Sequence, residues 1–220
     1  MSDFFKLSTE KYSNDKQISR KKFNTIIGFL LLYGFIMTFV ITVLFAEAVA
    51  NIPFLFLIIG YFICVIAGII MIKKSYSPIK SFIAYNLIVL PLGILLALIL
   101  PYYYLGTILM AMLLTGAITI VMVVFANIKP DWFISVSKIL PWLLLCVIIA
   151  EIVMLIMGFY LTIFDFIVLA IFAMYIGIDW IRMNSMPTTL CAAFDAAAEI
   201  YIDLINIFIR LLRILSRSND

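Results

Sequence analysis

The sequence contains little charge and no histidine. Only 12% of its 220 residues are charged, whereas 66% are hydrophobic. A soluble domain of this length needs more polar surface, so the composition excludes the soluble classes and predicts an all-α, multi-pass membrane protein. Without histidine the chain lacks the usual neutral-pH proton carrier and a common metal ligand. A pH response near neutrality must therefore come from carboxyl groups that hold protons.

Cysteine is also scarce, and no cofactor is predicted. Cys64, Cys146 and Cys191 lie in apolar segments without metal-ligand spacing, which favours buried, inert thiols. The sequence shows no internal repeat, linker or low-complexity tract. We therefore predict one transmembrane domain over residues 23–217, preceded by a basic cytoplasmic arm over residues 1–22.

The apolar segments are long enough to cross a bilayer, which takes about 20 residues. The predicted spans are approximately 23–46, 53–72, 78–100, 103–126, 139–159, 162–181 and a more polar seventh, 188–214.

The lysines and arginines predict the orientation. Six lie in the arm, three follow the second span, two surround the loop after the fourth, and Arg182 follows the sixth. The alternate loops, near residues 47–52, 101–104 and 160–162, contain none. By the positive-inside rule the N-terminus is cytoplasmic. A short arm without a transit peptide favours the bacterial inner membrane, with lipids as the first partners.

The last segment conflicts with this rule if it crosses fully, because its arginines then lie outside. Two alternatives stay open. Either the segment is re-entrant and returns to the cytoplasm, or it crosses and its arginines pair with acids or lipid headgroups.

The same segment carries a polar face. Asp195, Glu199 and Asp203 are four residues apart and fall within an arc of about 80° on a helix. The same arc contains Asn206, Arg210, Arg213 and Arg217. Charges are costly within a bilayer, so this face lies against protein or water. It is either an ion pathway, with Asp195, Glu199 and Asn206 as candidates, or a structural polar seam.

Other acids lie within or beside spans. Glu151, midway along the fifth, faces a cavity or is neutral, and is a further pathway candidate. Asp165 begins the sixth span, where an acid caps a helix well. Asp179 ends it, three residues before Arg182, and a local ion pair is the simplest interpretation. Arg210 and Arg213 are further candidate ion-pair partners.

The end of the chain resembles the Bax inhibitor-1 family, also called the transmembrane Bax inhibitor motif family. Residues 197–208 (AAEIYIDLINIF) and 211–215 (LLRIL) are similar to the family's closing signature, LYLDFINLF…LLRIL. Phe164-Asp165-Phe166 resembles its LDF motif, and Gly177-Ile178-Asp179 stands at its YD motif.

The resemblance implies a seven-helix bundle with the C-terminal helix at its centre. Bacterial members of the family are similar to pH-gated calcium leak channels, in which two aspartates share a proton and hold the pore closed. Carried over, these are Asp179 and Asp203, which would ionise, repel and open the pathway as pH rises. Transported Ca²⁺ would meet oxygen ligands from Asp195 and Asp203. A pH-sensitive calcium leak channel, or a cation and proton-coupled pathway, is the expected function.

This sequence departs from the family in three places. Its second span is uncharged, whereas bacterial members often carry a Glu and an Arg there. The tyrosine before Asp179 is missing, and Asp195 and Glu199 are additional acids.

The sequence leaves two other functions to consider. A regulator without transport would bind a membrane protease or another membrane protein through the arm. An intramembrane aspartyl protease would use Asp179 and Asp203, but the last span lacks the Gly-x-Gly-Asp and Pro-Ala-Leu patterns of those enzymes. We therefore predict neither an enzymatic activity nor a nucleic-acid partner.

Overall fold

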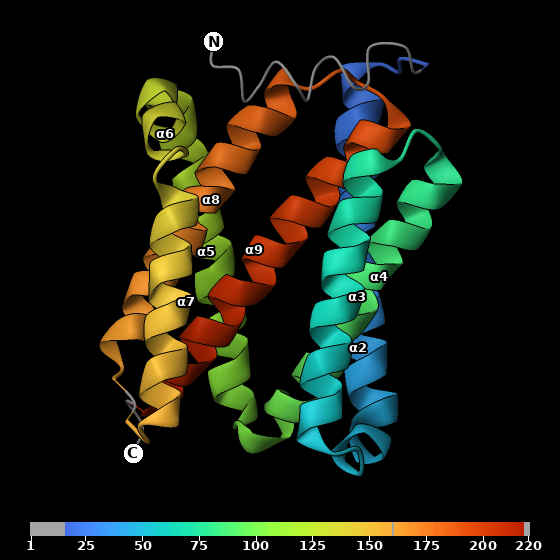
Figure 1. Cartoon of the computed structure of the whole chain (residues 1–220). Coiled ribbons are helices and arrows are strands. Elements are labelled where there is room, and N and C mark those ends of the chain that lie inside the picture. Colours follow the sequence, from blue (N-terminus) through green and yellow to red (C-terminus); the bar gives the residue numbers. More distant parts are fainter. Residues whose placement is uncertain (1–15, 160, 218–220) are drawn as a thin grey trace. The chain divides into compact units, whose positions relative to one another are not determined.

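The computed structural model describes residues 16–159 and 161–217, which form eight α-helices and one short 3₁₀ helix (Figure 1). The helices are α2 (Arg20–Ala50), α3 (Phe54–Lys74), α4 (Pro78–Ile99), η1 (Leu100–Tyr102), α5 (Leu105–Ile128), α6 (Pro130–Val136), α7 (Leu140–Ile156), α8 (Ile163–Ser185) and α9 (Leu190–Arg217).

Five helices are long and apolar enough to cross a membrane: α2, α3, α4 with η1, α5 and α8. Helices α6 and α7 meet at a bend of 50° and form a sixth candidate if the pair is one span. The chain is therefore an all-helical protein with several membrane-spanning segments. Helix α9 covers the predicted seventh span but is not among these candidates, because three acids and three arginines interrupt its apolar residues.

The prediction of seven helices is wrong for the described residues, and the additional helix is α6. Pro130 occupies its first turn, where a helix tolerates proline, and Asp131 follows at the favourable N-terminal end. Phe133 is fully buried and lies so close to Gly177 of α8 that an added Cβ would overlap its ring. The short helix is therefore held by packing that its sequence did not reveal.

Helix α2 begins three residues before the predicted span. Ser19 caps it by accepting a hydrogen bond from the backbone N–H of Lys22 at 3.3 Å. Part of the predicted basic arm is thus helical, and residues 1–15 lie outside the described residues. The prediction of one domain with a cytoplasmic arm stays a prediction.

The chain divides into two compact units, and α8 and α9 each contribute residues to both. The first contains the described residues up to Tyr102 together with Arg182–Ile202. In it α4 packs against α2 and α3. The aromatic residues Tyr85 and Tyr201 approach Gly34 of α2 so closely that a Cβ there would lie 2.9 Å from both.

Polar bonds join α2 to its neighbours in the first unit. The Tyr85 hydroxyl donates to the carbonyl oxygen of Leu30 at 2.7 Å, and the Tyr201 hydroxyl shares a hydrogen bond with Thr38. These groups are buried, so each bond satisfies a polar atom that would otherwise be costly in apolar surroundings.

The second unit contains the described residues of Tyr103–Ile181 and those from Asp203 to Arg217. Its hydrophobic core is built from α5, α6, α7 and α8, with Ala126, Phe133, Leu140, Val147, Val168, Ile171 and Ile178 as the buried members. The Trp180 indole also donates to Asn127 at 3.2 Å, which links α8 to α5.

The expectation of buried cysteines is confirmed only for Cys191. Cys64 is half-buried and Cys146 is exposed at the protein surface. Both lie on apolar helices whose outer faces are hydrophobic, so an apolar neighbourhood in the sequence did not distinguish packing from surface.

Candidate functional site

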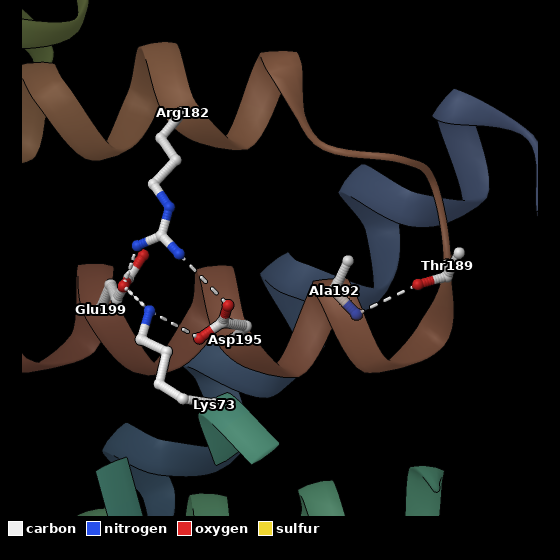
Figure 2. Close-up of polar contacts among 6 residues, drawn as sticks. All are labelled: Lys73, Arg182, Thr189, Ala192, Asp195 and Glu199. Carbon is white, nitrogen blue, oxygen red and sulfur yellow. Dashed lines mark hydrogen bonds and ion pairs between the residues drawn. The ribbon is translucent and has the colours of Figure 1, made fainter. Parts of the chain in front are cut away.

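Four charged side chains from three helices form the first polar assembly, shown in Figure 2. Lys73 ends α3, Arg182 lies in the last turn of α8, and Asp195 and Glu199 lie on α9. We call these residues the four-charge cluster. The Lys73 Nζ lies 3.1 Å from Asp195 Oδ1, and the Arg182 Nη2 lies 3.4 Å from Asp195 Oδ2. Both cations also bond to Glu199.

Local sequence explains where each of these charges lies on its own helix. Asp195 and Glu199 are four residues apart and therefore share a face of α9. Lys73 and Arg182 lie in the last turns of their helices, where cations interact favourably with the helix dipole. Buried alanines flank the acids, namely Ala192, Ala193, Ala196, Ala197 and Ala198. Small side chains let neighbouring helices approach closely.

The charges of the cluster balance, two positive against two negative. The Asp195 side chain is only 2% exposed, so its carboxylate has lost most of its water. Removing one partner of such a pair costs far more than the pair contributes, because a buried charge is left uncompensated. The four residues thus form one network of charges that joins α3, α8 and α9.

The second assembly contains the aspartates that the resemblance singled out. Asp179 of α8 and Asp203 of α9 belong to the same unit. Asp203 is 5% exposed and Asp179 is half-buried. Both carboxyl groups contribute to the electrostatic field at the Tyr175 hydroxyl. Tyr175 stands one turn before Asp179 on α8.

The third assembly, which we call the arginine cluster, consists of Arg210, Arg213, Glu151 and Asp165. The Arg210 guanidinium bonds both carboxylate oxygens of Glu151, one of them at 2.9 Å, and Asp165 Oδ1 at 2.8 Å. Arg213 lies 3.6 Å from the same oxygen. Asp165 is fully buried. The cluster joins α7, α8 and α9.

Arg217 continues this pattern at the end of α9 by donating to the Thr162 hydroxyl at 2.7 Å. The sequence left open how arginines at the end of the last segment would be accommodated. Of the partners considered, acids of the protein itself are observed for Arg210 and Arg213.

A family model described as "Inhibitor of apoptosis-promoting Bax1" matches residues 15–220. The chain belongs to the Bax inhibitor-1 family. A search of curated proteins finds no match. With its apolar helices, this Bax inhibitor-1 family member is an integral, multi-pass membrane protein.

The predicted site residues of this family member thus fall into separate groups. Asp195 and Glu199 pair with Arg182 and Lys73, and Glu151 pairs with Arg210. Asn206 is half-buried on α9. Their assignment to an ion pathway stays a prediction, as does calcium binding by Asp195 and Asp203. Within residues 16–159 and 161–217, no three acidic, cysteine or histidine residues form a ready metal site.

Sequence reasoning missed two residues of these assemblies, Lys73 and Tyr175. Lys73 closes a span that is otherwise uncharged, and this position was the available signal. Tyr175 precedes Asp179 by four residues, and helical spacing would have placed the two on one face.

Proposed function

We propose that this protein is a pH-sensitive calcium leak pathway, closed when Asp179 and Asp203 share a proton. The observation that carries the proposal is the presence of both aspartates, one on α8 and one on α9, within the same compact unit of a chain of the Bax inhibitor-1 family. The proposal includes seven crossings around α9, a cytoplasmic N-terminus and a bacterial inner membrane. It assigns no enzymatic activity.

The mechanism follows from the chemistry of two neighbouring carboxyl groups. One proton between them forms a hydrogen bond and leaves a single negative charge. When that proton is lost, both carboxylates are charged, and unit charges brought to within about 4 Å of each other repel by about 4 kcal/mol at an effective dielectric constant near 20. That energy is enough to shift a closed state toward an open one. Calcium flux therefore rises with pH.

The remaining acids supply the proposed path. Calcium takes six to eight oxygen ligands, which water and backbone carbonyls provide in part. Asp195, Glu199, Asn206 and Glu151 are the candidates for the side-chain oxygens. Asp195, Glu199 and Glu151 are held in ion pairs in this structure, and the proposal takes this paired arrangement as the closed state of the path.

Reconstituted liposomes loaded with a calcium indicator test the proposal. The wild-type protein is compared with Asp203→Asn and with Asp131→Asn, which changes an exposed acid on α6 as a matched control. We expect Asp203→Asn to lose the pH dependence of calcium entry, because an amide cannot ionise. Asp131→Asn should behave as wild type. Equal pH dependence in all three proteins would contradict the assignment of Asp203.

A regulator that acts by contact is the second candidate. It is favoured by the position of Gln17–Arg20, which lie against the connection between α8 and α9 rather than apart from the helices. In that case the liposomes show no calcium entry at any pH. Deletion of residues 2–15 then abolishes the cellular function, whereas Asp203→Asn leaves it intact.

A further inference from the structure

The residues just before α2 are attached to the connection between α8 and α9. Gln17 and Thr189 form an antiparallel bridge. The backbone N–H of Ile18 donates to the carbonyl oxygen of Thr188 at 2.7 Å, and the Thr188 hydroxyl donates back to the carbonyl oxygen of Ile18 at 2.6 Å. Segments some 170 residues apart in sequence are thus paired through their backbones.

Arg20 extends this attachment to the end of α8. Its guanidinium donates to the carbonyl oxygens of Met183 at 3.2 Å, Asn184 at 3.1 Å and Met186 at 3.2 Å. The last carbonyls of a helix have no partner within the helix, and a cation suits that end of the helix dipole. A guanidinium is a flat group whose five donors are spread over three nitrogens, so it can reach acceptors on three residues at once. The ammonium of lysine presents its three donors from a single nitrogen and is a poorer match for this arrangement.

Arg20 is itself held in place. Its guanidinium carbon lies 5.2 Å from the centre of the Phe23 ring, and Phe23 is fully buried. A cation above an aromatic face is attracted to it. The contact fixes the guanidinium at the start of α2, from where it reaches the end of α8.

The attachment lies directly beside the four-charge cluster. Met183 follows Arg182, whose carbonyl oxygen also accepts the N–H of Met186 at 3.0 Å. On the other side, Thr189 caps α9, its hydroxyl accepting the N–H of Ala192 at 3.2 Å (Figure 2). The connection held by residues 17–20 is therefore the one that sets the distance between Arg182 and the acids of α9.

We propose that Gln17–Arg20 form a clasp that positions Arg182 against Asp195 and Glu199, with Arg20 as the positioning residue. The position of residues 17–20 therefore influences the geometry of the four-charge cluster. A partner that draws this segment away from α8 and α9 loosens the cluster without touching it. This inference does not rest on calcium transport.

Two measurements on the full-length protein in lipid nanodiscs test the clasp. The first is amide hydrogen exchange over residues 183–193. The second is labelling of Arg182 by phenylglyoxal, read by mass spectrometry, which reports whether its guanidinium remains engaged. The variants are Arg20→Gln, Arg20→Lys and the matched control Lys21→Gln, which removes an exposed charge one residue later.

We expect Arg20→Gln to speed exchange over residues 183–193 about tenfold or more, since it removes charge-assisted bonds to three carbonyls. Labelling of Arg182 should rise in the same variant. Arg20→Lys should give intermediate values, and Lys21→Gln should match wild type. Wild-type exchange in Arg20→Gln would overturn the clasp. Faster exchange with unchanged labelling would overturn its action on Arg182.

A disulfide provides a test that does not depend on Arg20→Gln remaining stable alone. Ile18 and Thr188 adjoin the bridge between Gln17 and Thr189 and are joined by a backbone hydrogen bond, so cysteines at these two positions lie within reach of a disulfide. Cysteines at both positions, in a background without the three native cysteines, should crosslink on oxidation. The crosslink should restore protection and low Arg182 labelling to Arg20→Gln. The proposal would be overturned if the cysteines failed to crosslink, or if the crosslink failed to restore protection from exchange and low Arg182 labelling.

Discussion

Replacing Arg210 by methionine should destabilise the protein more than any change of an exposed charge. Methionine keeps much of the apolar stem but removes the cation that Glu151 and Asp165 share. Breaking a buried ion pair by removing one partner costs about 3–5 kcal/mol. Glu151 is 25% exposed and Arg213 stays beside Asp165, so some compensation remains. We therefore expect the free energy of unfolding to fall by about 3 kcal/mol, the lower end of that range.

The assay is unfolding in mixed micelles with increasing denaturing detergent, followed by tryptophan fluorescence. Lys138→Gln is the control, because it also removes one positive charge, from an exposed position in the same unit. It should stay within about 0.5 kcal/mol of wild type. Adding Glu151→Gln to Arg210→Met should recover part of the loss, since one uncompensated acid disappears. An Arg210→Met variant as stable as the control would refute the reasoning.

Three further predictions concern the packing and bonding of α2. Gly34→Ala should lower the free energy of unfolding measurably in the same assay, because the added Cβ would lie 2.9 Å from both Tyr201 and Tyr85. Gly28→Ala is the control, since its Cβ would meet nothing within 4 Å and should leave stability unchanged or raise it. Tyr201→Phe should cost about 1 kcal/mol, since it leaves the buried Thr38 hydroxyl without this bond. Combining Tyr201→Phe with Thr38→Val should cost less than the sum of the two single changes, and additive losses would show that the two hydroxyls do not interact.

Much of the fold was predictable because membrane helices are limited by length and hydropathy. The apolar segments at residues 53–72, 78–100 and 103–126 correspond closely to α3, α4 and α5. Helix boundaries set by local bonds were less predictable. Ser19 extends α2 toward the N-terminus, and α6 depends on the burial of Phe133 against α8. Neither interaction has a periodic signature in the sequence.

The candidate site was also predictable only in part. Helical spacing placed Asp195 and Glu199 on one face, and it indicated that the arginines of the last segment needed partners. It did not identify those partners, because Lys73 and Glu151 lie 126 and 59 residues away from the side chains they bind. A sequence pattern gives the face of one helix, whereas the partner depends on which helices pack together.

The most direct test of the central claim is calcium entry into liposomes that contain only the wild-type protein, measured in steps from pH 6 to pH 8. If ionisation of the Asp179 and Asp203 pair opens the pathway, entry is slow at the acidic end and rises as the pH increases. Entry that is independent of pH, or absent from vesicles shown to contain folded protein, would contradict the account.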